Sequence, residues 1–374
     1  MEQKSGEVAV HWITAPQESP AEADSGFLEV FREDQLIYRA ITPPGAAHRA
    51  AFPYREKRDL RIRYGGFSDS LDKHETTLYF SENPAKSPVQ FDKVDSVFVI
   101  GDVHGQYDNL VRLLGNAKLI DANRSWQARR AHLVLLGDLF DRGDDVTKCL
   151  WFLYRLEREA EARGGRVHVL LGNHEIMAFL NDLRYTSEKE KRIAQYHQTG
   201  YTAMFHVKES VLGRWLASKP ALIKINNILL AHGGVSPPFT AFTLQSFNDS
   251  LYAFLQEDEF PSLLQEGVAT VRGDATLYAR RLYFFFGDNS VFWQRGYIMS
   301  DTLKNDLKKT LDRFKAKYHV VAHTPVTRLQ SFYGGRVFAV DLHNPATEML
   351  LIVSNPYRDK IYRCLLEGKP EPLF

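Results

Sequence analysis

Residues 97–105 read Val97-Phe98-Val99-Ile100-Gly101-Asp102-Val103-His104-Gly105, and this stretch indicates the fold class. Four consecutive apolar residues are typical of a buried strand, and the strand is followed at once by Asp102 and His104. Open α/β sheets bind their ligands at the carboxyl ends of parallel strands. In an extended segment alternate residues point the same way, so Asp102 and His104 share one side, with Val103 on the other. The stretch therefore predicts a strand that delivers two potential ligands to one site.

Four later blocks repeat this pattern, each placing an Asp, Asn or His after a run of Val, Ile and Leu. They are Gly137-Asp138-Leu139-Phe140-Asp141-Arg142-Gly143, Gly172-Asn173-His174-Glu175, Ala231-His232-Gly233-Gly234 and Ala322-His323-Thr324-Pro325. One block alone would be incidental, since an isolated Asp-Arg pair is usually a surface ion pair worth at most about 1 kcal/mol. Five blocks in order, the first three spaced by about 35 residues, indicate a shared site.

The composition excludes several classes of protein. The chain has 374 residues, 44% hydrophobic and 25% charged, as expected of a globular protein. Its 47 basic and 46 acidic residues produce no field that would attract nucleic acid or a membrane surface. No apolar run reaches the roughly 18 residues of a membrane helix. The first six residues lack a signal-peptide core, so we expect a cytoplasmic protein if the chain is complete and a periplasmic one if a signal was removed. Cys149 and Cys364 are expected to be free thiols.

Two domains are predicted. Residues 1–92 contain alternating segments separated by turns, typical of a small all-β sandwich. The expected strands are Val8–Ile13, Phe27–Phe31, Leu36–Ala40, Leu60–Tyr64 and Thr76–Phe80. Residues 93–374 alternate strands with amphipathic helices, including a helix over Val146–Ala162 and a hairpin that turns at Asn226-Asn227. For this domain we expect an α/β fold in which two sheets pack face to face, with helices outside.

The residue types in the five blocks suit a two-metal phosphatase. Two divalent metals about 3.5–4 Å apart can activate water and stabilise the leaving oxygen of a phosphate ester. Asp138 can bridge the metals, and Asn173, His232 and His323 can complete the second one. Mn, Fe and Zn all accept this mixture of oxygen and imidazole ligands, so two divalent ions are expected without a choice among them.

These blocks resemble those of the phosphoprotein phosphatase branch of the calcineurin-like metallophosphoesterases. The resemblance covers roughly residues 95–330, and the features specific to that branch are Asp141-Arg142-Gly143 and Glu175. The N-terminal β domain and the segment Phe292–Tyr297 are similar to the Shewanella-like protein phosphatases and related bacterial phosphotyrosine-directed enzymes.

The resemblance also implies roles for individual residues. One metal would be held by Asp102, His104 and Asp138, and the other by Asp138, Asn173, His232 and His323. His174 would be the general acid, oriented by Asp141. Arg142 would clamp the phosphate, and Arg295 is a candidate second clamp, because a planar guanidinium fits two phosphate oxygens.

Three functions remain open at the level of sequence. The first is a protein phosphatase acting on phosphotyrosine or phosphoserine/threonine in a phosphoprotein or phosphopeptide. The second is a dinucleoside polyphosphate hydrolase, although that branch usually has Asp where this chain has Glu175. The third is an inactive phosphoprotein-binding module, which should have lost a ligand or the acid. Trp293 and the run Tyr283–Phe286 could line an apolar cleft that favours phosphotyrosine, but we expect the run to belong to the core.

Overall fold

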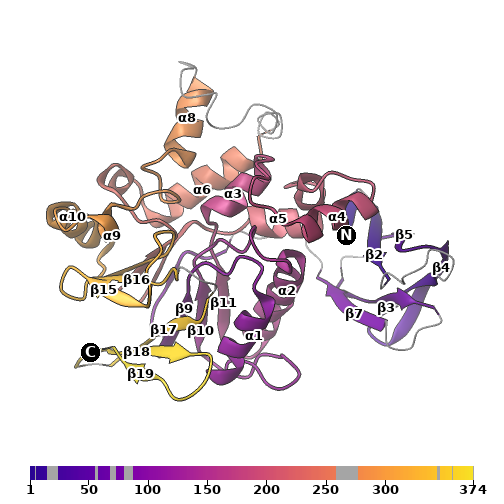
Figure 1. Ribbon diagram of the computed structural model, residues 1–374, viewed down its shortest axis with the longest axis horizontal. Helices are drawn as coiled ribbons and strands as arrows, with labels where there is room; N and C mark the ends of the chain where they lie inside the picture. The colour runs from indigo at the N-terminus through magenta and orange to yellow at the C-terminus, as the bar shows by residue number, and fades with distance from the viewer. Residues whose placement is uncertain are drawn as a thin grey trace. The chain divides into compact units, whose positions relative to one another are not determined.

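The computed structural model describes residues 1–4, 6–14, 24–54, 58–67, 73–79, 87–257, 277–342, 346–355 and 357–373 (Figure 1). The chain divides into two compact units. Unit 1 comprises Met1–Ala85 and Glu188–Ala217, and unit 2 comprises Lys86–Ser187 and Ser218–Phe374. Unit 1 thus takes residues from two separate parts of the chain.

Unit 1 is built mainly of two antiparallel sheets. One has the order β1-β2-β5, formed by Glu2–Lys4, Glu7–Ile13 and Ala47–Pro53. The other has the order β4-β3-β6-β7, formed by Gln35–Pro44, Ser25–Arg32, Leu60–Gly66 and Lys73–Leu78. Buried and less buried residues alternate along β3, and Leu28 and Val30 face the interior. The predicted strand-rich N-terminal region is confirmed, although Phe80 of the last predicted strand lies outside the described residues.

Three helical segments also belong to unit 1. They are α4 (Glu188–Tyr196), η2 (Thr202–Phe205) and α5 (Val211–Ala217). Their sequence distance from the strands is large, so local sequence patterns contain no sign of this association.

The first sheet of unit 2 is mixed. Its order is β11-β10-β9-β17-β18-β19, formed by Arg166–Val169, His132–Leu135, Ser96–Ile100, Glu348–Val353, Lys360–Leu365 and Glu371–Pro372. β9, β10 and β11 run parallel to one another, and β17 and β18 are antiparallel additions. The parallel strands are almost wholly buried because both of their faces are covered.

The second sheet of unit 2 has the order β15-β16-β14-β13-β12-β8. Its strands are Gln330–Phe332, Val337–Ala339, Tyr318–Val321, Ile228–Ala231, Leu222–Ile225 and Gln90–Phe91. β13, β14 and β16 are parallel, whereas β12 and β13 form the predicted hairpin at Asn226-Asn227. The sheets face each other, because the Phe91 ring of β8 lies 5.5 Å from the His132 ring and 4.5 Å from the His168 ring, centroid to centroid.

Helices cover the outer faces of this sandwich. α1 (Tyr107–Asn116) and α2 (Val146–Ala162) pack on the first sheet, and α6 (Leu244–Leu255) packs on β12 of the second. The other helical segments of unit 2 are α3 (Asn173–Phe179), η3 (Pro237–Ala241), α8 (Leu277–Phe286), α9 (Gly296–Met299) and α10 (Lys304–Phe314). The predicted two-sheet α/β sandwich flanked by helices is therefore confirmed.

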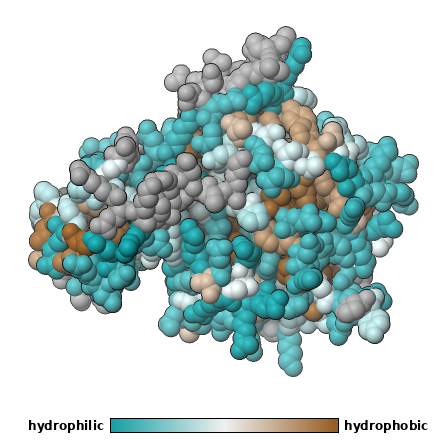
Figure 2. All heavy atoms as spheres, turned by 180° about the vertical axis from the view of Figure 1, so that it is seen from behind, coloured by the Kyte–Doolittle hydropathy of each residue, from teal (hydrophilic) through white to brown (hydrophobic). Residues whose placement is uncertain are grey.

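Figure 2 shows one face of the molecule, where hydrophilic side chains cover most of the area and hydrophobic ones gather in a few patches. None of the helices in the described part of the chain combines the length and apolar character needed to cross a bilayer.

Candidate active site

Six polar residues lie just beyond the carboxyl ends of six parallel strands. Asp102, Asp138 and Asn173 follow β9, β10 and β11 in the first sheet. His232, His323 and Asp341 follow β13, β14 and β16 in the second. All six side chains are buried, with exposed fractions of 5% or less. The sequence blocks predicted five of these positions. The sequence analysis did not predict Asp341, although it follows the apolar run at 337–340 in the same way that the other ligands follow theirs.

The first group of potential ligands consists of His104, Asp138 and His174, whose ligand atoms lie within 4.8 Å of one another. Nε2 of His104 lies 4.0 Å from Oδ2 of Asp138 and 3.7 Å from Oδ2 of Asp102. Nδ1 of His104 donates to the backbone oxygen of Phe140 at 2.7 Å, which directs the Nε2 lone pair into the site. Nε2 has no hydrogen-bond partner among the described residues.

The second group consists of Asp138, His232 and His323, again within 4.8 Å. Nε2 of His232 lies 3.3 Å from Oδ1 of Asp138 and 2.8 Å from Oδ1 of Asn173. Nε2 of His323 is buried, and nothing in the described part of the chain hydrogen-bonds to it. Burial, followed by the nearby His232, lowers the pKa of His323 to about 2, so its imidazole stays neutral and can bind a cation. Asp138 is the residue that the two groups share.

Three buried acids make this site electrostatically unfavourable by itself. Burial, Asp341 and Asp138 hold the pKa of Asp102 well above its ordinary value. Burial and Asp138 raise the pKa of Asp341 to about 6, and Asp341 also hydrogen-bonds to Asp102. Like charges at this separation in a poorly solvated site repel strongly. A divalent cation would relieve that repulsion, so the donor set and its charge both fit metal binding.

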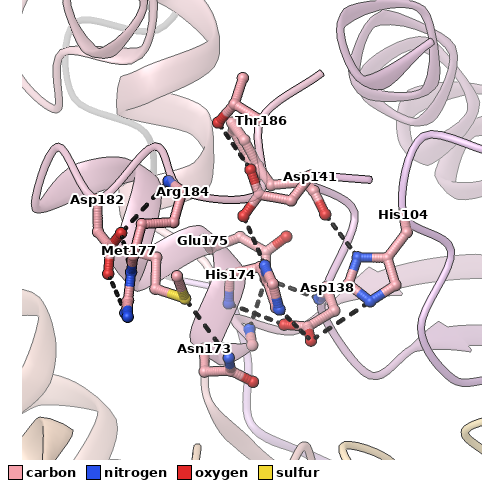
Figure 3. Close-up of polar contacts among 12 residues, drawn as sticks. His104, Asp138, Asp141, Asn173, His174, Glu175, Met177, Asp182, Arg184 and Thr186 are labelled. Carbon is pink, nitrogen blue, oxygen red and sulfur yellow. Dashed lines mark hydrogen bonds and ion pairs between the residues drawn. The ribbon is translucent and has the colours of Figure 1, made fainter. Parts of the chain in front are cut away.

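The side chain of His174 is held by a chain of hydrogen bonds that runs through Asp141 to Thr186 (Figure 3). Nδ1 of His174 donates to Oδ2 of Asp141 at 2.5 Å, and the Thr186 hydroxyl donates to Oδ1 of Asp141 at 2.8 Å. Nε2 of His174 faces Asp138, with Oδ2 3.8 Å away. Burial alone would lower the pKa of His174, but Asp138 and Asp141 outweigh it and raise the pKa. The imidazole is therefore aimed by Asp141, and both carboxylates favour its protonated form. Thr186 is a positioning residue that the sequence reading missed.

The loops that carry these residues have an unusual backbone. His104, Asp138, Asp141, Arg142 and His323 all have positive φ, between 47° and 68°. Few residues other than glycine adopt this conformation, and it concentrates at sites where surrounding structure imposes it. Each of the five is a residue that the sequence singled out for function.

Glu175 supplies part of that imposed structure. Its buried carboxylate accepts backbone N–H groups from Asp138 at 2.8 Å, Leu139 at 2.7 Å and Gly172 at 2.7 Å. The two loops also approach so closely that a Cβ on Gly137 would lie 2.3 Å from the nitrogen of Gly172. Glu175 was interpreted from sequence only as a mark of a branch, whereas its position explains how the β10 and β11 loops are held together.

The two predicted arginines lie at the solvent side of the cluster. Arg142 is exposed, and its positive charge lowers the pKa values of Asp102 and Asp341. Its backbone N–H donates to the oxygen of Tyr185 at 2.8 Å. Arg295 is also exposed, and Nη1 donates to the backbone oxygen of His323 at 2.9 Å. Both arginines therefore place positive charge near the cluster.

Aromatic side chains flank the cluster on two sides. The Tyr185 ring lies 5.6 Å from the His174 ring, and the Trp293 ring lies 5.3 Å from the His323 ring, centroid to centroid. Tyr185 is 51% exposed and was not predicted from sequence. Of the run at 283–286, Phe285 and Phe286 of α8 are buried against Phe254, as expected of core residues, whereas Tyr283 is 48% exposed.

Known proteins are similar to this chain over its central part. The model of the calcineurin-like phosphoesterase family matches residues 96–327. Shewanella-like protein phosphatase 1 of Plasmodium berghei is 26% identical over 250 residues, covering 66% of this chain and 66% of that protein. Shewanella-like protein phosphatase 2 of Arabidopsis thaliana is 39% identical over 123 residues, or 32% of each protein. The chain thus spans less than two thirds of the length of these curated relatives.

Two further proteins are similar to this chain. The symmetrical bis(5'-nucleosyl)-tetraphosphatase of Glaesserella parasuis is 28% identical over 176 residues, covering 46% of this chain and 55% of that protein. Among solved structures, the cold-active protein-tyrosine phosphatase of a psychrophilic Shewanella species is 28% identical with a TM-score of 0.69. That likeness covers 86% of this chain and 97% of the other chain, which is more than the family model covers.

Proposed function

Because this chain belongs to the calcineurin-like phosphoesterase family, we propose that it is a metal-dependent protein phosphatase. The family membership confirms the resemblance predicted from the five sequence blocks. One observation carries the proposal, namely that two groups of potential metal ligands share Asp138, and that the imidazole of His174 in the first group is held by Asp141. Phosphoester hydrolysis needs that combination of cations and acid.

We assign the metal ligands as the sequence predicts. Asp102, His104 and Asp138 would hold one divalent ion, and Asp138, Asn173, His232 and His323 the other. Among the described residues nothing hydrogen-bonds to Nε2 of His104 or of His323, and these two atoms together with the crowded carboxylates support this assignment. Two divalent ions bound there would supply a water of lowered pKa and polarise the phosphoryl oxygens. Asp341 would act behind Asp102, holding its carboxylate in place.

His174 is the proposed general acid. Phosphoester cleavage leaves an alkoxide or phenoxide that needs a proton, and a positioned imidazolium contributes about 10²–10⁴ in rate. Nδ1 is occupied by Asp141, so Nε2 is the atom that would give up its proton to the leaving oxygen. Thr186 limits rotation of Asp141 and therefore of the imidazole.

Arg142 and Arg295 are the proposed phosphate clamps. They come from different loops, and each can donate two parallel N–H groups to phosphate oxygens. The hydrogen bond from Arg295 to the His323 backbone ties the second clamp to a metal ligand. An anion held by both would be placed against the cluster.

Phosphotyrosine is the substrate class we favour. The Tyr185 ring lies next to the imidazole of the proposed acid, and its exposed face can stack on an aryl group. Trp293 offers a second aromatic wall beside His323. A seryl or threonyl side chain would gain less from either ring. The phosphoprotein or phosphopeptide would thus contribute both an anion and an aromatic surface.

A dinucleoside polyphosphate hydrolase is the second candidate. The similarity to a symmetrical bis(5'-nucleosyl)-tetraphosphatase favours it, and the same rings could contact adenine. An inactive phosphoprotein-binding module is a weaker alternative, because every proposed ligand and the proposed acid are retained in this chain.

One substrate panel separates these functions. The purified protein with added manganese would be assayed on a phosphotyrosine peptide, a phosphoserine peptide of the same sequence and diadenosine tetraphosphate. We expect the highest kcat/KM on the phosphotyrosine peptide. A higher value on phosphoserine would overturn the substrate preference alone. A higher value on diadenosine tetraphosphate would replace the protein phosphatase proposal, and the absence of turnover on all three would favour the binding module.

A further inference from the structure

A groove of 910 Å³ lies at the end of unit 2 opposite the candidate active site. Its walls come from α10, from the turn between β15 and β16, and from the start of β18, which Figure 1 shows at one end of the unit. β14 and β16 are parallel, and both begin at the groove, near Tyr318 and Arg336. Both end at the active site, near His323 and Asp341. The groove is therefore separate from the site, at roughly one strand length.

The acidic side chains in the groove are already paired with cations. Nζ of Lys317 lies 3.1 Å from Oδ2 of Asp359, and the Tyr318 hydroxyl donates to the same oxygen at 3.0 Å. Asp312 pairs with Lys308 at 2.6 Å. Neither acid is left to neutralise other positive charge in the groove.

Three more cationic side chains line the groove, and no described acidic residue pairs with them. Arg336, Arg358 and Lys360 are exposed, and none of them makes an ion pair with any acidic residue that the structure describes. They come from two segments, the turn before β16 and the residues that lead into β18. Positive charge is therefore distributed along the groove, and an anionic ligand bound there would be stabilised by several cations together.

The floor of the groove is apolar. Leu311 and Ile361 are buried, and Ala316 and the ring of Tyr318 lie beside them. The volume falls within the range of ligand sites, about 300–1,000 Å³, and is far larger than a single phosphate needs. An acidic peptide satisfies both features, since spaced carboxylates reach the distributed cations while an apolar side chain covers the floor. A nucleotide concentrates its charge at one end and matches this distribution less well.

We propose that this groove is a second binding site, which docks an acidic segment of a partner protein through Arg336, Arg358 and Lys360. The site does not depend on the reaction proposed above. Bidentate pairing of guanidinium with carboxylate would give the two arginines most of the recognition.

Binding is tested with a fluorescent Glu-rich peptide that contains interspersed Leu, using anisotropy on the full chain. The wild type should bind saturably and lose affinity as salt rises. Arg336→Glu combined with Arg358→Glu should weaken binding about tenfold or more, which is 1.4 kcal/mol or more. The control pair is Arg130→Glu with Lys369→Glu, two exposed cations outside the groove that change the net charge equally. Turnover of p-nitrophenyl phosphate checks that each variant is folded and should match the wild type.

Several results would overturn the proposal. The wild type could fail to bind the acidic peptide, or could bind a peptide with Gln in place of Glu equally well. The groove variant could weaken binding no more than the control pair. Binding of ATP or inorganic phosphate that depends on Arg336 and Arg358, without binding of the peptide, would identify a small-anion site instead.

Discussion

Asp138 is the side chain on which the proposed site most depends, because both groups of ligands include it. Asp138→Asn keeps the size of the side chain but removes the charge needed to hold two cations. We expect loss of at least one metal and of most activity, with the fold retained. Metal content and turnover would be measured together. Asp108→Asn, the same change at an exposed position, is the control. Wild-type turnover with both metals bound in the Asp138 variant would refute the ligand assignment.

His174 should affect proton transfer more than metal content. We expect His174→Asn to lower turnover of alkyl phosphates by about 10²–10⁴. The loss should be smaller for p-nitrophenyl phosphate, whose leaving group needs little protonation. Equal losses on both substrates would argue against a general acid. Because Nε2 lies 3.8 Å from Asp138, metal content must also be measured, and loss of metal would identify His174 as a ligand.

Arg142 should act on substrate binding with the metals intact. Arg142→Ala removes the guanidinium, so we expect a higher KM and a lower kcat/KM. Arg142→Lys should recover only part of the loss, since an ammonium cannot pair with two phosphate oxygens in a fixed plane. Full recovery by lysine would show that charge alone matters at this position.

At the level of elements, two buried histidines on the neighbouring strands β10 and β11 should make the free energy of unfolding depend on pH. Nε2 of His168 and Nδ1 of His132 lie 3.0 Å apart between the two sheets. Burial, followed by the charge of Arg166, lowers the pKa of His132 to about 4, and burial with His132 holds the pKa of His168 well below 6.5. The unfolded chain therefore binds more protons than the folded one between these values. The contribution of this histidine pair to the free energy of unfolding is fully present above about pH 6.5 and is lost as the pH falls toward 4.

Urea unfolding at pH 7.5 and pH 5 would measure this effect. We expect His132→Leu combined with His168→Leu to show a smaller drop in the free energy of unfolding between the two pH values than the wild type. The other buried histidines are the same in both proteins, so the difference isolates this pair. An identical drop in both proteins would mean that the pair is not the source.

Single elements were well predicted where the pattern was long or repeated. The helix predicted from the apolar face of Val146–Ala162 has the same bounds as α2. A helical period of 3.6 residues sustained over about four turns rarely occurs in segments that are not helices. The run before Asp102 gave β9, since a short apolar segment that ends in a polar residue suits a buried parallel strand. The segment Glu188–Ala217 was not placed, because its association with unit 1 depends on contacts distant in sequence.

For the whole molecule, metal binding should contribute to stability as well as to activity. Asp102, Asp138 and Asp341 repel one another in a buried site, so removal of the cations should destabilise the fold. A ligand at 100 times its Kd stabilises a protein by about 2.7 kcal/mol. We therefore expect a chelator to lower the Tm by several degrees, and added manganese to restore it. Asp138→Asn should respond much less. A Tm that is insensitive to the chelator in the wild type, with metal removal verified, would contradict this account.

By itself, the sequence determined the fold class, the family and most of the proposed chemistry. Strands that end in Asp, Asn or His are local patterns, and parallel strands in one sheet necessarily bring their carboxyl ends to one edge. Only the tertiary structure showed the contributions of Asp341, Thr186, Tyr185 and Glu175, which lie in three separate segments of the chain. Thr186, Tyr185 and Glu175 have no local signature of their roles, because each role consists of contacts with residues brought close by folding. Asp341 differs, because it follows an apolar strand as the predicted ligands do. The basic groove likewise exists only because α10, the β15–β16 turn and β18 meet in space.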